Sequence, residues 1–353
     1  MEFKKNTVKC DIGSYIHYWR GIKKSGKTTL FYDLVKEQYG DLEKGLLISV
    51  GNEIGYQALD GLIYINTPTW SDVEEVVTEL VENKADNKFE VVCFDTVDEL
   101  IKLAKAEVVR LHKKKTGNVV EFNAALGGYG APRDKVNELI DTVLAKIRSA
   151  GYGLVLIGHC KIKDIKEKNG DAYQKLGSNL NEDFDNIFAN KADIIMTIYS
   201  EKEIDESKHI SDVQRYMYFR TDGFVDAGGR FKNIPDRVEY GARNYIDAFE
   251  QAVKGAINGD VTDKEITKRK KAEKAERDKA AAEFAKVEKS AKANEELEAR
   301  REDFISVISA NFSSADDDVK AKAKAMLAES GAKKFTDEAL PIETLKAISE
   351  LFE

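Results

Sequence analysis

The sequence predicts an α/β protein in which a mostly parallel, twisted sheet is flanked by helices. Two apolar runs, Val91–Phe94 and Leu154–Ile157, are typical of strands that are buried on both faces. Such runs alternate along the chain with helical patterns and glycines, which favours parallel strands joined by helices. After about residue 260, the composition predicts a long charged helix and then a small helical domain at the C-terminus.

The expected elements alternate in the order that such a sheet requires. Strands are expected at Ser14–Trp19, Leu46–Val50, Leu62–Ile65, Phe89–Phe94, Leu154–Gly158, Ile194–Tyr199 and Arg215–Arg220. Helices are expected at Thr28–Tyr39, Ser71–Asn83, Thr96–Leu111, Arg133–Ala150 and Tyr245–Lys254. The alternation implies that helices cover the sheet and that the connections run over its faces.

The charged segment separates two regions that have the pattern of a packed core. The expected parts are a core domain over 1–258, a charged helical linker over 259–302 and a small helical domain over 303–353. Acid–base pairs spaced four apart, such as Glu273–Arg277, favour a solvated helix in the linker. A long exposed spacer is one interpretation, and a coiled coil or a partner-binding helix is the other. The apolar positions in this segment are few, at Ile266, Phe284, Val287 and Leu297.

The C-terminal domain is expected to contain three helices. The first would carry Phe304, Ile308 and their apolar neighbours, the second would begin after Ser314, and the third would open at Pro341. No recognisable catalytic group lies in this part of the chain. These helices are one candidate site for a protein partner.

Composition excludes several classes of protein. The 353 residues include 63 acidic and 55 basic side chains, for a formal net charge of −8, which excludes a globally basic nucleic-acid binder but not local basic loops. The three cysteines have no paired spacing, so a disulfide framework or a cysteine-based zinc site is not expected. Neither a bilayer-spanning apolar run nor a signal-peptide core is evident, so we expect a soluble, cytoplasmic protein without membrane contact.

A phosphate-binding motif lies between the first expected strand and the first expected helix. Residues 21–28 read Gly-Ile-Lys-Lys-Ser-Gly-Lys-Thr and match G-x-x-x-x-G-K-[ST] in the required strand–loop–helix context. Glycines at both ends allow a tight turn whose N–H groups form an anion-binding nest, and the helix N-terminus adds a positive dipole end. Lys27 would reach the β- and γ-phosphates, Thr28 would complete a Mg²⁺ shell, and Thr29 would lie near the α-phosphate. The nucleotide-binding candidates are Gly21, Ile22, Lys23, Lys24, Ser25, Gly26, Lys27, Thr28 and Thr29.

A second acidic element is expected beside this loop. The strand Phe89–Phe94 is followed by Asp95, which is the Walker B pattern, and Asp95 would hold Mg²⁺ through water together with Thr28. The alternative is that Asp95 only caps the following helix, a role for which Thr96 competes. The cofactors expected from the two motifs are ATP and Mg²⁺, and the absence of a guanine-reading motif favours ATP over GTP.

Hydrolysis also needs a residue that orients water. Glu53 follows the strand Leu46–Val50 at the same edge of the sheet as the phosphate loop and is the preferred candidate; Asp98 and Glu99 are the alternatives. His159 ends the strand Leu154–Gly158 and would face the γ-phosphate, unless it is merely a hydrogen-bonded histidine. The catalytic candidates are Lys27, Glu53, Asp95 and His159.

These elements together resemble the RecA-like ATPase core. The chain is more similar to the AAA-type nucleotide-binding proteins of bacteriophages, a group that includes RecA-like single-strand annealing proteins. The resemblance covers about residues 8–255 and is carried by Lys23–Leu30, Phe94–Thr96, Gly151–His159, Tyr218–Thr221 and Ala227–Phe231. It implies a RecA-like P-loop fold and, for a phage protein, the cytoplasm of a bacterial host. The phosphate loop departs from the pattern, with Ile22-Lys23-Lys24 where many RecA-like proteins have Pro or Gly.

By this resemblance, two segments would contact single-stranded DNA. RecA-like proteins bind single strands through loops that correspond here to His112–Arg133 and Lys161–Leu180. Basic side chains follow phosphates and aromatic rings stack on bases without reading sequence, although either segment could instead be a solvated, mobile loop. The candidate contacts are Lys113, Lys114, Lys115, Tyr129 and Arg133 in the first segment, and Lys161, Lys163, Lys166, Lys168 and Tyr173 in the second.

The resemblance also implies a homo-oligomer with ATP between subunits. A cation from the neighbouring subunit would then stabilise the transition state. The candidates, which follow late strands, are Arg220, Arg230, Lys232 and Arg237. Each of them could equally be a surface ion-pair partner.

The sequence therefore predicts a Mg²⁺-dependent ATPase that hydrolyses ATP to ADP and phosphate, binds single-stranded DNA and supports recombination or strand annealing. One alternative is a motor or loader ATPase of replication. Another is a nucleotide-gated scaffold that recruits a partner through its C-terminal helices.

Overall fold

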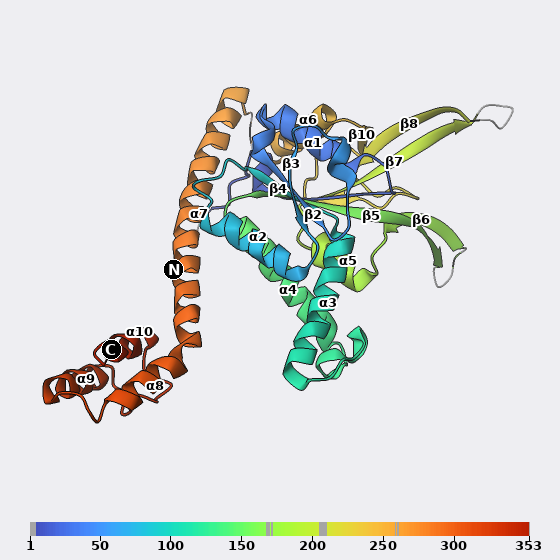
Figure 1. Cartoon of the computed structure of the whole chain (residues 1–353). Helices are drawn as coiled ribbons and strands as arrows, with labels where there is room; N and C mark the ends of the chain where they lie inside the picture. Colours follow the sequence, from blue (N-terminus) through green and yellow to red (C-terminus); the bar gives the residue numbers. More distant parts are fainter. Residues whose placement is uncertain are drawn as a thin grey trace. The chain divides into compact units, whose positions relative to one another are not determined.

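A mostly parallel sheet lies at the centre of the larger of two units (Figure 1). The computed structural model describes residues 5–166, 170, 172–204, 210–257, 259 and 261–352. The chain divides into two compact units, Met1–Ala282 and Glu283–Glu353. The first unit thus extends past the expected core boundary at residue 258 and includes part of the expected linker.

The described residues place ten strands in this sheet, in the order β10-β8-β7-β1-β5-β4-β2-β3, with β6 paired to β5 and β9 to β7. The strands are β1 (Ile16–Gly21), β2 (Gly45–Val50), β3 (Ile63–Thr67), β4 (Val91–Asp95), β5 (Gly153–Lys166), β6 (Ala172–Ser178), β7 (Ile194–Ile204), β8 (Ile210–Tyr218), β9 (Gly228–Gly229) and β10 (Arg237–Glu239). Strands β1, β2, β3, β4, β5 and β7 pair in parallel, whereas β6, β8, β9 and β10 join antiparallel. The mixed α/β architecture confirms the expected fold class.

Helices cover both faces of the sheet (Figure 1). One layer contains α1 (Lys27–Tyr39) and α6 (Ala242–Ala256); the other contains α2 (Trp70–Glu82), α3 (Val97–Thr116), α4 (Ala131–Ser149) and α5 (Glu182–Ala189). Under the first layer, Trp19, Phe31 and Tyr245 are fully buried. Each such side chain contributes about 1.5–3 kcal/mol by burial, so this layer fixes α1, and with it the phosphate loop, against β1.

Two pairs of strands differ from the expected pattern. Strand β5 was expected to end at Gly158 but continues to Lys166 and pairs antiparallel with β6. Strand β7 likewise continues to Ile204 and pairs with β8. Both pairs run out beyond the rest of the sheet (Figure 1). The segment Lys161–Leu180, expected as a loop, is thus largely an antiparallel strand pair. Along β5, Lys163 and Ile165 are half-buried whereas Ile162, Asp164 and Lys166 are exposed, an alternation that suits a half-covered ribbon.

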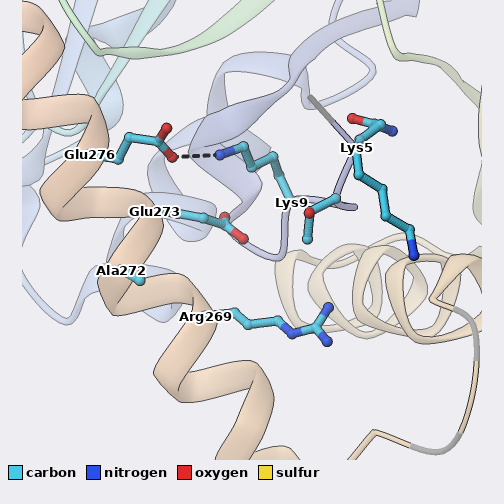
Figure 2. A pocket seen from close by; sticks show the side chains of 8 residues that line it. Lys5, Lys9, Arg269, Ala272, Glu273 and Glu276 are labelled. Atoms are coloured by element: carbon cyan, nitrogen blue, oxygen red, sulfur yellow. Dashed lines mark hydrogen bonds and ion pairs between the residues drawn. The ribbon is translucent and has the colours of Figure 1, made fainter. Parts of the chain in front are cut away.

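The first half of the charged helix α7 (Asp263–Ala299) packs within the first unit, which differs from the interpretation of this segment as a long exposed spacer. The carboxylate of Glu273 is buried and accepts hydrogen bonds from the backbone N–H groups of Cys10, at 2.7 and 2.9 Å, and of Asp11, at 2.9 Å. Figure 2 shows this helix face beside the N-terminal segment, with Lys9 paired to Glu276. Apolar contact is also present, because Ile266 belongs to the main core.

The second unit contains the remainder of α7 and three short helices. These are α8 (Arg301–Asn311), α9 (Asp317–Glu329) and α10 (Ile342–Ser349), with Pro341 immediately before α10. Their apolar faces form a separate core that includes Phe304, Ile308, Leu327, Leu345 and Ile348. Three helices at these positions were expected from the sequence.

Candidate nucleotide-binding site

The phosphate loop joins β1 to α1 at the carboxyl edge of the parallel strands. Gly26 precedes α1 with φ of 96°, a left-handed conformation that favours glycine. Gly21 lies opposite His159 in the register of β1 and β5. Ser25 and Lys27 are buried, whereas Ile22, Lys23, Lys24 and Thr29 are exposed. The loop thus turns one lysine inward and leaves two facing solvent.

Lys27 is held at the centre of the loop by its own backbone. Its Nζ donates to the carbonyl oxygens of Gly21, at 3.1 Å, and Ile22, at 2.9 Å, and lies 3.4 Å from Nδ1 of His159. Burial lowers the pKa of the Lys27 ammonium, and the nearby carboxylate of Asp95 opposes this effect. A buried cation surrounded by backbone dipoles is well suited to bind phosphate oxygens.

Asp95 and Thr28 meet beside this lysine. The Thr28 hydroxyl donates to Oδ2 of Asp95 at 2.7 Å, although 67 positions separate them in the chain. The N-cap of α3 is Thr96, whose hydroxyl accepts from the N–H of Glu99, so Asp95 is not the capping residue. Burial raises the pKa of Asp95, and the hydrogen bond from Thr28 opposes this effect.

The surroundings of this pair fit a small cation. A Cβ added at Gly55 would lie 3.2 Å from the Thr28 hydroxyl oxygen and 3.9 Å from Asp95 Oδ2, so glycine keeps this side of the pair open. No group of three or more His, Cys, Asp or Glu side chains suited to a metal occurs in the part of the chain that is described. One carboxylate and one hydroxyl are the protein share expected where Mg²⁺ is bound mainly by phosphates and water.

Glu53 and His159 complete the cluster around Lys27. The Nε2 of His159 lies 3.8 Å from Oε1 of Glu53, and the hydroxyl of Ser49 donates to the carbonyl oxygen of Glu53 at 2.6 Å. The imidazole of His159 lowers the pKa of the Glu53 carboxyl, and burial opposes this shift. Glu53 is therefore held ionised next to the phosphate loop.

Asp98 fixes the strand that carries His159. Its Oδ2 accepts from the backbone N–H of His159 at 2.9 Å, and its Oδ1 accepts from the Asn179 side chain at 3.1 Å. Glu99 pairs with Lys102 on the same helix. The two alternatives to Glu53 are thus already engaged, one with the backbone and one with a lysine.

A family model described as an AAA domain matches residues 16–231, which is more than half of the chain. The chain belongs to this AAA domain family. The family is one of nucleotide-binding P-loop ATPases, and the matched range contains the phosphate loop, Asp95, Glu53 and His159. Among curated proteins, no match is found.

The two groups of predicted DNA contacts lie on different elements of the structure. Lys113, Lys114 and Lys115 lie in the last turn of α3, not in a loop as expected, and basic side chains are favourable there because of the helix dipole. The 20 residues of α3 place this turn about 30 Å from Asp95. Tyr129 is fully exposed, and Arg133 pairs with Asp183.

The second group lies on the β5–β6 pair, which begins beside the phosphate site. Lys161, Lys166 and Tyr173 are exposed, and Lys163 donates to the carbonyl oxygen of Leu180 at 3.2 Å. Lys168 lies outside the described residues. Ile162, which the sequence reasoning did not single out, is also exposed on β5.

Three of the four cations predicted to act on a neighbouring subunit have partners in their own chain. Arg220 donates to the carbonyl oxygen of Phe231, Arg230 pairs with Asp193 at 2.9 Å, and Arg237 pairs with Glu201. Lys232 is exposed. These contacts favour a structural role for the three arginines within their own chain.

Two residues that the sequence reasoning missed contact the phosphate loop from the β8–β10 side. The Tyr240 hydroxyl donates to the carbonyl oxygen of Gly26 at 2.9 Å, and the Arg215 guanidinium lies 4.7 Å from the Tyr240 ring centroid. No motif marks either residue, and both are about two hundred positions from the loop.

Across the described ranges, no helix has the length and apolar character needed to cross a membrane.

Proposed function

We propose that the protein is a Mg²⁺-dependent ATPase whose turnover is coupled to binding of single-stranded DNA. The observation that carries the proposal is the contact of Thr28 with Asp95 beside the buried ammonium of Lys27. A hydroxyl, a carboxylate and an amine from two motifs lie together at one edge of the sheet in the AAA domain. This combination suits a triphosphate better than it suits a structural ion pair, because Lys27 bonds only to carbonyls and a histidine among the contacts described.

Each residue of the site has a role in the proposed reaction. Lys27 would hold the β- and γ-phosphates, and Thr28 and Asp95 would hold the cation, directly and through water. Bound Mg²⁺ would neutralise charge on the phosphate oxygens. Glu53, kept ionised by His159, would orient the attacking water and accept its proton.

The proposed coupling to DNA runs along the protein strand β5. His159 lies 3.4 Å from Lys27, and the same strand continues without a break to the exposed Lys161 and Lys166. A change in the contacts of His159 on hydrolysis would therefore move the base of the β5–β6 pair. Exposed lysines and Tyr173 on this ribbon suit phosphates and bases of a single strand. In this proposal, the protein forms a homo-oligomer and uses this coupling to support recombination or strand annealing.

The test measures ATP turnover with and without single-stranded DNA, and DNA affinity at several salt concentrations. Double substitution Lys161→Glu and Lys166→Glu should weaken DNA binding strongly and abolish its effect on turnover, and the wild-type affinity should fall steeply with salt. The matched control, Lys264→Glu with Lys268→Glu, makes the same charge change at exposed lysines of α7 that lie outside both predicted DNA segments. Equal losses in both double variants, or DNA binding unchanged in the first, would refute the proposed ribbon contact.

The alternatives give different results in the same assay. A replication motor or loader would also translocate on DNA or load a helicase. A nucleotide-gated scaffold would bind ATP with almost no turnover, with or without DNA.

A further inference from the structure

Strand β1, which leads into the phosphate loop, contains a fully buried cation. Arg20 directly precedes Gly21 and is 1% exposed. Its Nη2 donates to Oδ2 of Asp226 at 2.9 Å and to the carbonyl oxygen of the same residue at 2.8 Å, and its Nη1 lies 3.5 Å from Oδ2 of Asp185. A buried guanidinium is costly unless it is paired, so these contacts fix the position of Arg20.

The start of the phosphate loop has little room to move independently of Arg20. The carbonyl oxygen of Gly21 accepts from Nζ of Lys27 at 3.1 Å. A Cβ added at Gly21 would lie 2.5 Å from the hydroxyl oxygen of Ser25 and 3.2 Å from the carbonyl oxygen of Ile198, so the backbone is closely packed here. A shift of Arg20 would therefore move the carbonyl group that holds Lys27.

Asp226 connects Arg20 to the β5–β6 pair. Its second carboxylate oxygen, Oδ1, lies 2.8 Å from Nζ of Lys175 on β6. Its backbone N–H donates to the carbonyl oxygen of Leu176 on the same strand at 2.9 Å. Burial raises the pKa of Asp226, but the charges of Arg20 and Lys175 outweigh this effect, and the pKa is lowered. One ionised carboxylate thus bridges the residue before the phosphate loop and a strand of the β5–β6 pair.

Lys175 is the accessible member of this arrangement. Its side chain is 30% exposed, whereas that of Arg20 is 2% exposed. It lies on the strand that pairs with β5, which carries the exposed Lys161 and Lys166. A phosphate of a single strand bound to this pair would compete with Asp226 for the Lys175 ammonium. Withdrawal of that cation would change the electrostatic balance at Asp226, and Arg20 would respond because it is paired to the same carboxylate.

We propose that Asp226 is a positioning residue through which the β5–β6 pair and the phosphate loop affect each other. When a DNA phosphate binds Lys175, Asp226 and Arg20 rearrange, and the affinity of the phosphate loop for ATP changes. By thermodynamic linkage, bound ATP changes the affinity for DNA by the same factor. The inference rests on the proposed function and adds a connection through β6 and β1 to the one through His159 on β5.

The experiment measures the dissociation constant of a non-hydrolysable MgATP analogue with and without saturating single-stranded DNA. In the wild type, DNA should change this constant about fivefold or more. Lys175→Met imitates withdrawal of the ammonium, so it should shift the constant without DNA in the direction in which DNA shifts the wild type. DNA should then change the constant of this variant by less than about twofold.

Two further variants separate the ion pair from a merely structural effect. Lys175→Arg keeps a cation for Asp226 and should retain the wild-type response to DNA. Lys191→Met is the matched control, because Lys191 has a similar exposed fraction, 34%, and pairs with Asp141 at 2.9 Å. It should also respond as the wild type does.

Each outcome has a distinct meaning. A wild-type response in Lys175→Met, or an equal loss of response in Lys175→Arg or Lys191→Met, would overturn the role of Asp226. Asp226→Asn should also lose the response, and the variants of the partly exposed Lys175 remain decisive if Asp226→Asn unfolds.

Failure of the inference can be distinguished from failure of the proposed function. If the wild type binds the analogue and DNA independently of each other, the role of Asp226 is refuted, whereas binding of the two ligands stands. If the wild type binds no DNA, the proposed function fails, and the inference fails with it.

Discussion

Two carboxylates at the two ends of strand β4, one buried and one half-buried, have different partners. At its carboxyl end, Asp95 accepts from Thr28 at 2.7 Å beside the phosphate loop. Directly before its first residue, Glu90 pairs with Lys274 at 2.5 Å and lies 3.9 Å from Arg277, both on α7. The carboxyl end of β4 thus belongs to the candidate ligand site, whereas the residue before its other end forms ion pairs that hold helix α7.

The comparison shows which of these carboxylates a sequence pattern can assign to a role. Asp95 is recognisable because a metal and a triphosphate require the same residue types at the same strand ends in many proteins. Glu90 has no such requirement, because any cation from any later segment can satisfy it. Charge patterns along α7 indicate a helix but do not indicate which of its charges are buried.

The largest expected effect is at the phosphate loop. Lys27→Ala should lower kcat/KM for ATP about 1,000-fold, or roughly 4 kcal/mol, because the only buried ammonium described in the loop is removed. Steady-state turnover measures it. Lys23→Ala removes an exposed lysine of the same loop and should cost much less. Equal losses in the two variants would show that burial of Lys27 has no special role.

A smaller loss is expected at the candidate base. Glu53→Gln keeps the size of the side chain and removes its charge, so it should lower kcat about 100-fold with little change in ATP affinity. Single-turnover kinetics and equilibrium binding separate the two quantities. Asp98→Asn provides the comparison: if it reproduces this pattern and Glu53→Gln does not, Asp98 is the catalytic base.

On helix α7, the expected effect is on stability. Glu273→Ala leaves the N–H groups of Cys10 and Asp11 without their acceptor, which should lower the free energy of unfolding by about 2–4 kcal/mol. Urea unfolding measures it. Glu283→Ala, an exposed acid on the same helix, should change it by less than about 0.5 kcal/mol. If only surface charges held α7, the two variants would give equal, small changes in the free energy of unfolding.

The smallest effect is a pH shift. His159 lowers the pKa of Glu53, so the ionised carboxylate is present above this lowered pKa and is lost as pH falls through it. Without the imidazole, the pKa of Glu53 returns towards its ordinary value. The acid limb of the kcat profile should therefore move to higher pH in His159→Ala, whatever the change in maximal rate. If the acid limb stays at the same pH in His159→Ala, Glu53 is not the group whose ionisation sets that limb.

The sequence predicted most of the parallel core because its strands are continuous apolar runs and its helices are amphipathic. It missed α5, which has only eight residues, and the extension of β5 beyond Gly158, where mostly polar, exposed or half-buried residues replace the apolar run. Lys27, Thr28 and Asp95 were predicted to meet because motif and topology act together. Arg215 and Tyr240 were not, because their position depends on antiparallel pairing at a distant edge.

The docking of α7 could not be predicted for a different reason. A buried acid such as Glu273 looks the same in sequence as an exposed acid such as Glu283, and only the N–H groups facing it distinguish the two. Those donors lie more than 260 positions earlier in the chain. Helical periodicity contains no information about such a partner.

The central claim is that Asp95 and Thr28 hold a cation together with a nucleotide, and metal binding tests it most directly. Mn²⁺, which replaces Mg²⁺ and is observed by electron paramagnetic resonance, should bind the wild-type protein tightly only when ATP is present. This ATP-dependent signal should be lost in Asp95→Asn and retained in Glu90→Gln, the substitution at the opposite end of the same strand. Equal Mn²⁺ binding by the wild type and Asp95→Asn would contradict the claim.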